Sequence, residues 1–106
     1  MSPRLPLRDI RIVDLTMGWS GPLATRHLAD MGAEVIKIES CGYPDWWRGW
    51  ENTPEALASK EHEKSPSFNQ INRNKLGITI DLTKDRGRAL ALQLGARADA
   101  VIENQA

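Results

Sequence analysis

Residues 10–39 decide the fold: Ile10-Arg-Ile-Val-Asp-Leu-Thr16, Met17-Gly-Trp-Ser-Gly-Pro22, Leu23-Ala-Thr-Arg-His-Leu-Ala-Asp-Met-Gly32 and Ala33-Glu-Val-Ile-Lys-Ile-Glu39. The first part is an apolar run of strand length, and residues 35–38 form a second one. Between them, apolar residues recur at helical spacing, which predicts a helix over 21–31. Ser20 is its expected N-cap and Gly32 its end. Parallel strands need a crossover helix, so the stretch predicts a parallel β–α–β unit.

The second half of the chain repeats the same alternation of elements. Residues 77–82 read Gly-Ile-Thr-Ile-Asp-Leu, which alternates with period two and predicts a strand. A helix follows over 86–96, capped by Thr83 or Asp85, and residues 100–102 make a fourth short strand. The expected fold class is therefore α/β, with a Rossmann-like parallel sheet and flanking helices.

A long segment without clear periodicity, residues 40–69, separates the two halves. It predicts a functional loop with at most one helical turn, over 54–60. The segment holds Trp46, Trp47 and Trp50, which in a loop rich in proline and glycine favour an interface or a pocket over a core. A non-enzymatic module that displays these tryptophans to a partner is one hypothesis for function.

Composition limits the classes of partner. The 106 residues carry 14 basic and 14 acidic side chains, which gives no electrostatic case for nucleic acid or an anionic membrane. No apolar run approaches the length of a membrane helix, and the start lacks the apolar stretch of a signal peptide. The single Cys41 fits a reducing compartment, so a cytoplasmic location is expected. One cysteine and two distant histidines provide no metal-ligand spacing.

A nicotinamide-dependent oxidoreductase is a second hypothesis. Glu39 ends the second strand where a ribose-binding acid would stand. Gly18 and Gly21 do not have the spacing of a dinucleotide loop, however, and Trp19 and Pro22 crowd the pyrophosphate position. The glycines are more simply explained as turn residues.

Other polar residues give weaker signals. Asn72-Arg-Asn-Lys75 offers two cations and two amides to phosphate groups, although such segments are commonly solvated loops. His27 is expected to pack on the apolar side of its helix, and His62 to be exposed in a charge run. Cys41 is a weak candidate for a reactive thiol because no activating group can be placed beside it.

An ordered set of short motifs resembles the N-terminus of family III CoA-transferases (the CaiB/BaiF family). The resemblance covers nearly the whole chain, except the tryptophan-rich loop. The motifs are Val13-Asp-Leu-Thr16, Ser20-Gly-Pro22, Leu28-Ala-Asp-Met-Gly-Ala-Glu-Val-Ile-Lys-Ile-Glu39, Asp45-x-x-Arg48, Asn72-Arg-Asn-Lys75, Ile80-Asp-Leu82 and Ala98-Asp-Ala-Val-Ile-Glu-Asn104.

The resemblance implies an activity and an architecture. Members move coenzyme A from an acyl-CoA donor to a carboxylic acid, so acyl-CoA is a substrate and no permanently bound cofactor is expected. Racemases and related isomerases share the scaffold and remain an alternative. The family architecture implies that residues 1–106 are the N-terminal part of the large, CoA-binding domain, with the small domain absent, and that full-length chains form an interlocked homodimer.

The resemblance also implies a set of site residues. Trp19 and Ser20 match positions that line the acyl and coenzyme A site, and Ile80, Asp81, Leu82 and Thr83 match backbone along the nucleotide. Asn104 and Gln105 match a pair that contacts coenzyme A. Ser40 stands where members often have an arginine, and Gln105-Ala106 where they show phenylalanine and a basic residue, so two contacts are in doubt.

The catalytic group is expected outside the chain. Members use an aspartate as a carboxylate nucleophile, and none of the aspartates here matches it, so it should follow residue 106. Asp14 and Asp81 are interpreted as structural. Since the chain also stops directly after a strand, we expect it to be the front of a longer protein and to be inactive alone.

Overall fold

The structure is a computed structural model that describes residues 4–49 and 53–105. Trp50 and Ala106, which enter the interpretations above, lie outside the described residues. The elements in chain order are β1 (Arg11–Asp14), α1 (Ser20–Asp30), β2 (Glu34–Glu39), η1 (Trp46–Arg48), α2 (Pro54–Ala58), η2 (Glu61–Glu63), α3 (Pro66–Ile71), β3 (Leu76–Thr79), α4 (Asp85–Ala96) and β4 (Ala100–Ile102).

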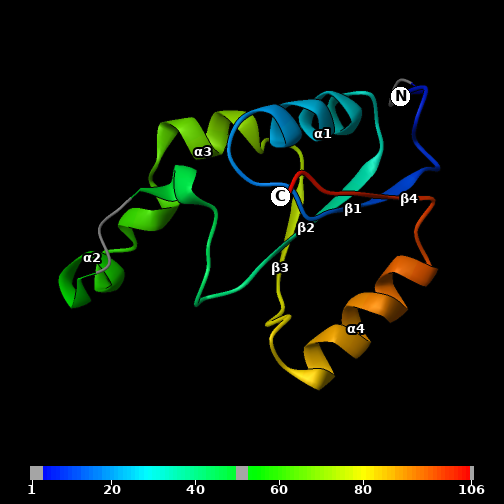
Figure 1. The fold of residues 1–106 in the computed structure, drawn as a ribbon. Coiled ribbons are helices and arrows are strands. Elements are labelled where there is room, and N and C mark those ends of the chain that lie inside the picture. Colours follow the sequence, from blue (N-terminus) through cyan, green and yellow to red (C-terminus); the bar gives the residue numbers. More distant parts are fainter. Residues whose placement is uncertain (1–3, 50–52, 106) are drawn as a thin grey trace.

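The strands form one parallel, four-stranded sheet in the order β3-β2-β1-β4 (Figure 1). In the register, Val13 lies beside Ile36 on one side and beside Val101 on the other. From β1 the chain runs outward through β2 to β3, and then returns to place β4 on the opposite side of β1. The predicted α/β class and parallel sheet are confirmed.

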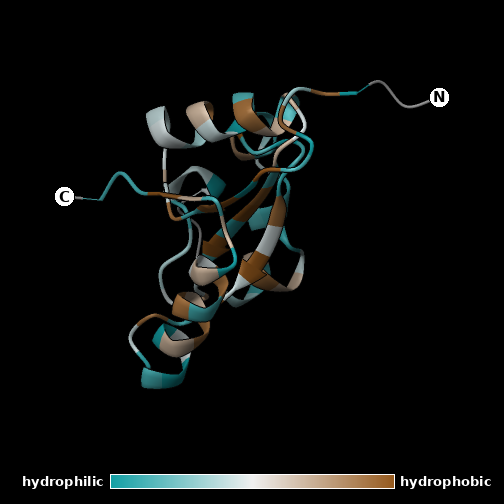
Figure 2. Cartoon of the chain, turned by 90° about the vertical axis from the view of Figure 1, so that its right-hand side faces the viewer, coloured by the Kyte–Doolittle hydropathy of each residue, from teal (hydrophilic) through white to brown (hydrophobic). Residues whose placement is uncertain are grey.

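Helices cover both faces of the sheet. On the face covered by α1, buried Ile12 and Val35 pack with Ala29. On the opposite face, Val13, Ile38 and Ile80 form a second cluster, which Leu94 of α4 joins. Strand side chains alternate between the two faces, which explains why neighbours such as Ile12 and Val13 belong to different clusters. Figure 2 shows the hydrophobic strands between the upper and lower helices.

The start of α1 differs from the prediction, whereas its end agrees. Ser20 is already helical, and the preceding Trp19 is the N-cap, without a capping side-chain hydrogen bond. Pro22 lies in the first turn, where its missing N–H has no intrahelical partner to lose. Gly32 adopts φ +103°, and its N–H donates to the carbonyl of Ala29, as expected of a glycine after a helix.

The segment over 40–69 holds more helix than predicted. The expected turn over 54–60 is the short helix α2, but α3 was missed. Its start carries a recognisable signal: the Ser65 hydroxyl accepts a hydrogen bond from the Phe68 N–H, and Pro66 occupies the first turn. Buried Phe68 and Ile71 then anchor the helix.

The loop between β3 and α4 corrects the predicted cap. Neither Thr83 nor Asp85 caps α4, because Lys84 occupies the N-cap position without a side-chain hydrogen bond. Thr83 instead donates its N–H and its hydroxyl to the Asp81 carboxylate. This hydrogen-bonded turn follows directly after β3, which ends at Thr79 rather than at residue 82.

Gly87 allows α4 to pack closely against this turn, so Gly87→Ala should destabilise the full-length protein. A Cβ at this position would overlap the carbonyl oxygen of Asp81 and lie 2.8 Å from its carbon. We expect a loss of about 1–3 kcal/mol, the usual cost of overpacking, measured by urea unfolding. Gly95→Ala is the matched control on the same helix, because the nearest atom to its Cβ, on Val101, is 3.7 Å away. Equal stability of the two variants would contradict this packing.

Candidate functional site

The sheet order reverses at β1, and this places the candidate site. The connection after β1 leads to β2 on one side, whereas β4 pairs on the other side. In open α/β sheets, ligands bind where strand order reverses, outside the carboxyl ends of the strands. Here that point lies between residues 16–20, which follow β1, and residues 103–105, which follow β4.

A cavity of about 720 Å³ lies at this point. Its walls come from the segment after β1, from the loop after β2 and from the chain after β4. The lining residues are Met17, Trp19, Ser20, Tyr43, Trp46, Asn104 and Gln105.

Two amide side chains join the segments after β1 and β4. Asn104 accepts a hydrogen bond from the Met17 N–H (3.0 Å) and donates one to the Met17 carbonyl (2.9 Å). Gln105 donates to the carbonyl of Leu15 at 3.3 Å. Gly21 leaves room for Thr16 and Asn104, because a Cβ there would lie 2.5 Å from the Thr16 side chain and 3.0 Å from that of Asn104. Asn104 therefore holds the backbone at the wall of the cavity.

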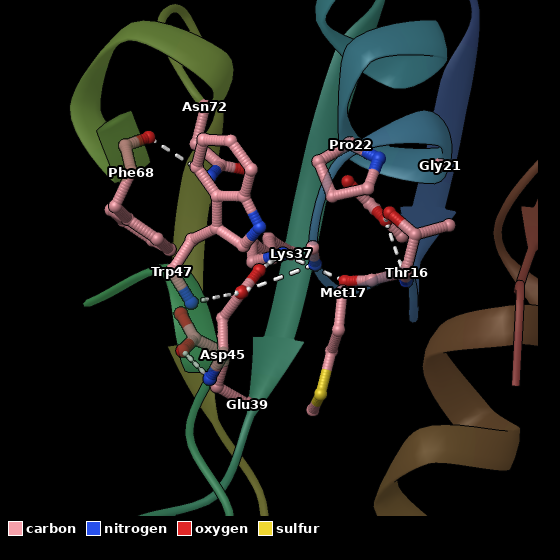
Figure 3. A network of polar contacts seen from close by, with 12 residues as sticks. Thr16, Met17, Gly21, Pro22, Lys37, Glu39, Asp45, Trp47, Phe68 and Asn72 are labelled. Carbon is pink, nitrogen blue, oxygen red and sulfur yellow. Dashed lines mark hydrogen bonds and ion pairs between the residues drawn. The ribbon is translucent and has the colours of Figure 1, made fainter. Parts of the chain in front are cut away.

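A buried ion pair supports the other wall (Figure 3). The Lys37 ammonium lies 2.8 Å from the Asp45 carboxylate and donates to the Thr16 carbonyl at 2.7 Å. The Asp45 carboxylate also accepts from the backbone N–H groups of Gly18 (3.2 Å) and Trp47 (3.0 Å). The two side chains are 3% and 0% exposed. The pair therefore connects the turn after β1 to the tryptophan segment.

The tryptophans form a packed cluster beside the cavity. Trp47 lies between the other two, with ring centroids 5.1 Å from Trp19 and 5.6 Å from Trp46. These separations suit tilted aromatic pairs. Two of the three rings, those of Trp19 and Trp46, line the cavity. Trp50 lies outside the described residues.

The Glu39 carboxylate is hydrogen-bonded by other residues of the chain. Its carboxylate accepts two hydrogen bonds from Arg48, at 2.8 and 2.9 Å, and a third from the Asp45 N–H. Burial would raise the pKa of Glu39, but the hydrogen bonds from Arg48 and Asp45 outweigh it and lower the pKa. The Arg48 guanidinium also stacks on Phe68, 3.7 Å from the ring centre. Glu39 thus pairs with Arg48 where a dinucleotide site would use it for a ribose.

A second buried network lies under α1 and corrects the interpretation of Asn72-Arg-Asn-Lys75. The Lys75 ammonium lies 2.9 Å from the Asp14 carboxylate, with side chains only 2% and 0% exposed. Arg73 pairs with Asp30 at 2.8 Å. Lys75 is therefore buried against a carboxylate and does not face phosphates, whereas Arg73 is 54% exposed in a surface pair with Asp30.

Asp14 is structural, as interpreted from the sequence. Burial would raise its pKa, but hydrogen bonds from Thr16 and Thr25 and the charge of Lys75 outweigh it and lower the pKa. These partners join β1 to α1 and to the segment before β3.

The structure separates the site residues expected from the resemblance into two places. Trp19, Ser20, Asn104 and Gln105 line the same cavity. Ile80–Thr83 lies after β3, beside α4. There Ile80 is buried in the core, the Asp81 carboxylate accepts from Thr83, and Leu82 lines a separate apolar groove of about 620 Å³. Ser40 follows β2, and its hydroxyl accepts from the Tyr43 N–H.

Sequence reasoning missed four residues of the site and misplaced two histidines. Met17 and Tyr43 line the cavity, and Lys37 and Asp45 support it. A lysine inside a short apolar strand was a signal for a buried partner. His27 is exposed rather than packed, and His62 is half-buried rather than exposed.

Residues 4–49 and 53–105 hold no cluster of three or more His, Cys, Asp or Glu side chains able to bind a metal ion. Nor do they hold a helix long and apolar enough to cross a membrane.

The chain is similar to known proteins over nearly its whole length. Residues 7–106 match the sequence model of CoA-transferase family III. An acyl-CoA transferase of Fusarium pseudograminearum is 42% identical over 92% of this chain and 22% of its own length. The succinyl-CoA:glutarate CoA-transferase of Mus musculus is 39% identical over 93% and 21%.

A solved structure has the same fold. The crystal structure of a CAIB/BAIF family protein from Brucella suis matches with a TM-score of 0.81 and 34% identity, over 97% of this chain and 26% of that one. The chain thus spans about a quarter of the length of the proteins it matches.

Proposed function

The chain belongs to CoA-transferase family III, and on that premise we propose that the full-length protein moves coenzyme A between an acyl-CoA donor and a carboxylic acid. The observation that carries the proposal is the cavity where the strand order reverses, lined by Trp19, Ser20, Asn104 and Gln105. Its position is the one at which open α/β sheets bind nucleotide-bearing ligands.

The proposed binding mode follows the carboxyl edge of the sheet. The thioester end lies in the cavity near Trp19 and Ser20, at the N-terminus of α1, where no side chain of the N-cap residue makes a capping hydrogen bond. Backbone N–H groups at a helix N-terminus suit a developing oxyanion. The nucleotide end runs past Ser40 toward Ile80–Thr83. From β4 to β3 there are three inter-strand steps, or about 14 Å, a span that the long coenzyme A molecule covers.

We propose that the nucleophile is an aspartate outside this chain. No carboxylate is among the cavity-lining residues of the described part of the chain. Asp14 and Asp45 are buried in ion pairs, and Asp30 pairs with Arg73. Such committed carboxylates are poor candidates for attack on a thioester.

Further proposals concern the whole protein. The chain is the N-terminal part of the large domain, which its coverage of a quarter of its relatives supports. Its radius of gyration of 14.4 Å also exceeds the roughly 13 Å of a compact domain of this length. We place the enzyme in the cytoplasm, because Cys41 is a free, exposed thiol.

Two further proposals concern activity and assembly. Residues 1–106 alone are inactive, and the full-length protein is an interlocked homodimer.

The test is a transfer assay on the full-length protein with Asn104→Ala. Removing the Asn104 side chain deletes both hydrogen bonds to Met17. We expect kcat/KM for transfer to fall by about 10–100-fold, as when a positioning contact is lost. Asn69→Ala is the matched control, since the Asn69 side chain donates to the carbonyl of Glu63 and lies outside the cavity lining. If both variants lowered kcat/KM equally, the coenzyme A site would not lie in this cavity.

Assays on the same full-length protein distinguish two alternative functions. A racemase or isomerase would epimerise a chiral acyl-CoA without releasing coenzyme A to an acceptor. A nicotinamide-dependent enzyme would alter NADH fluorescence on binding. Transfer to a carboxylate with neither signal is the expected result.

A further inference from the structure

Three aromatic side chains give the cavity its surface. Trp19, Tyr43 and Trp46 line it while remaining 55%, 71% and 49% exposed. Such rings present large apolar faces that attract planar groups by offset or edge-to-face stacking. These three rings therefore lie at the surface of the cavity rather than in the core.

The wall is also held in one arrangement. Gly18 adopts φ +83°, and a Cβ there would overlap the Trp46 ring. The Trp19 ring contacts the Trp47 ring, and the Trp47 backbone N–H donates a hydrogen bond to the buried Asp45 carboxylate. A ligand that stacks on a preorganised wall does not have to order it, which favours selectivity.

The distribution of charge around the cavity also favours an apolar ligand. No lining residue within the described ranges is charged. Beside the cavity, Lys37 is paired with Asp45, and Arg48 with Glu39. The nearby Glu103 adds a negative charge and accepts from the Gln105 N–H. Among the described residues, a carboxylate entering here would meet the neutral Ser20, Asn104 and Gln105 but no cation, so its loss of water would be poorly compensated.

We infer that the acyl group transferred at this site is planar and apolar, an aryl group above all, and not a dicarboxylic acyl group. The inference rests on the proposed function and names its substrate class. It separates this chain from the mouse relative, whose name specifies succinyl-CoA and glutarate. Both of those carry a carboxylate at the far end, for which the described lining offers aromatic faces and neutral hydroxyl and amide groups but no cation.

The experiment compares donors on the full-length protein. Benzoyl-CoA and phenylacetyl-CoA are tested against succinyl-CoA and glutaryl-CoA, each with its own free acid in isotopically labelled form as acceptor, so that transfer appears as label in the thioester. Binding of each thioester is measured separately by calorimetry. We expect kcat/KM for the aryl donors to exceed that for the dicarboxylyl donors by at least about 100-fold, the range that an unpaired polar group costs in a pocket.

Variants of the wall test the cause. Trp46→Ala should lower kcat/KM for aryl donors about tenfold, with inhibition by free coenzyme A unchanged. Trp19→Arg should raise the ratio of dicarboxylyl to aryl transfer about tenfold by adding a cation. Leu57→Ala is the control, because Leu57 is exposed on α2 and outside the cavity lining.

The outcomes test the substrate class and the proposed function separately. Transfer that prefers succinyl-CoA or glutaryl-CoA overturns the substrate class while leaving the proposed function intact. Binding of the thioesters without transfer to any carboxylate overturns the proposed function itself. If Trp19→Arg does not fold, the wild-type donor preference and Trp46→Ala still decide the substrate class.

Discussion

Asp45→Ala is expected to destabilise the full-length protein by about 3–5 kcal/mol, the usual cost of leaving one member of a buried ion pair alone. The substitution strands the Lys37 ammonium, which is 3% exposed, and removes the acceptor for the N–H groups of Gly18 and Trp47. Because those two N–H groups belong to the turn after β1 and the tryptophan segment, the aromatic wall should loosen as well. Urea unfolding measures the first effect, and circular dichroism of the coupled tryptophans measures the second.

The control for Asp45→Ala is an ion pair at the surface. Glu61 lies 3.4 Å from Lys64, with both side chains more than half exposed. Glu61→Gln should change stability by less than about 1 kcal/mol, because water screens such pairs. If Asp45→Ala cost as little as Glu61→Gln, or left the tryptophan dichroism unchanged, the buried pair would not support the wall.

Lys75→Met is expected to have an effect of similar size, about 3–5 kcal/mol at neutral pH, and to change the acid limb of the stability curve. It removes the cation beside Asp14, which is 0% exposed. In the wild type the folded-state pKa of Asp14 is lowered, so its contribution is present above the unfolded pKa, near 3.9, and is lost as pH falls through the folded value. Without the charge and hydrogen bond of Lys75 the pKa of Asp14 should be higher than in the wild type, so the loss begins at higher pH.

Two companion variants check the pH prediction. Arg73→Met removes a pair in which the arginine is 54% exposed, so it should cost less than about 1 kcal/mol. The double variant Lys75→Met, Asp14→Asn removes both buried charges and should recover part of the loss. Urea unfolding from pH 3 to 8 measures all four proteins. An acid limb in Lys75→Met identical to the wild type would contradict the role given to the pair.

The fold was largely predictable because apolar periodicity reports burial directly. The alternation over 77–82 and the helical spacing after Leu23 predicted a strand and a helix close to β3 and α1. The helix α3 was missed because its six residues are too few for a periodic signal, although Ser65 and Pro66 marked its start. The side of β1 on which β4 pairs was not predictable, since the local pattern of a strand does not depend on its neighbour.

The site was harder to predict because the sequence shows where the charged residues are but not which residues they pair with. Lys75 and Arg73 suggested phosphate contacts, yet Asp14 and Asp30, far away in the sequence, neutralise them. Lys37 could have been recognised as a buried cation from its place in an apolar strand. Its pairing with Asp45, which lies in the following loop, could not have been predicted in the same way. Trp19 and Asn104 were named from the resemblance, and their meeting at one cavity depends on the strand order.

The central claim is that the cavity between the ends of β1 and β4 takes the thioester end of an acyl-CoA. The most direct measurement is a crystal structure of the full-length protein with bound benzoyl-CoA. We predict the thioester between Trp19, Ser20 and Asn104, with the nucleotide running toward the ends of β2 and β3. A thioester bound elsewhere, such as in the apolar groove between α4 and the sheet lined by Leu82 and Leu92, would contradict the account.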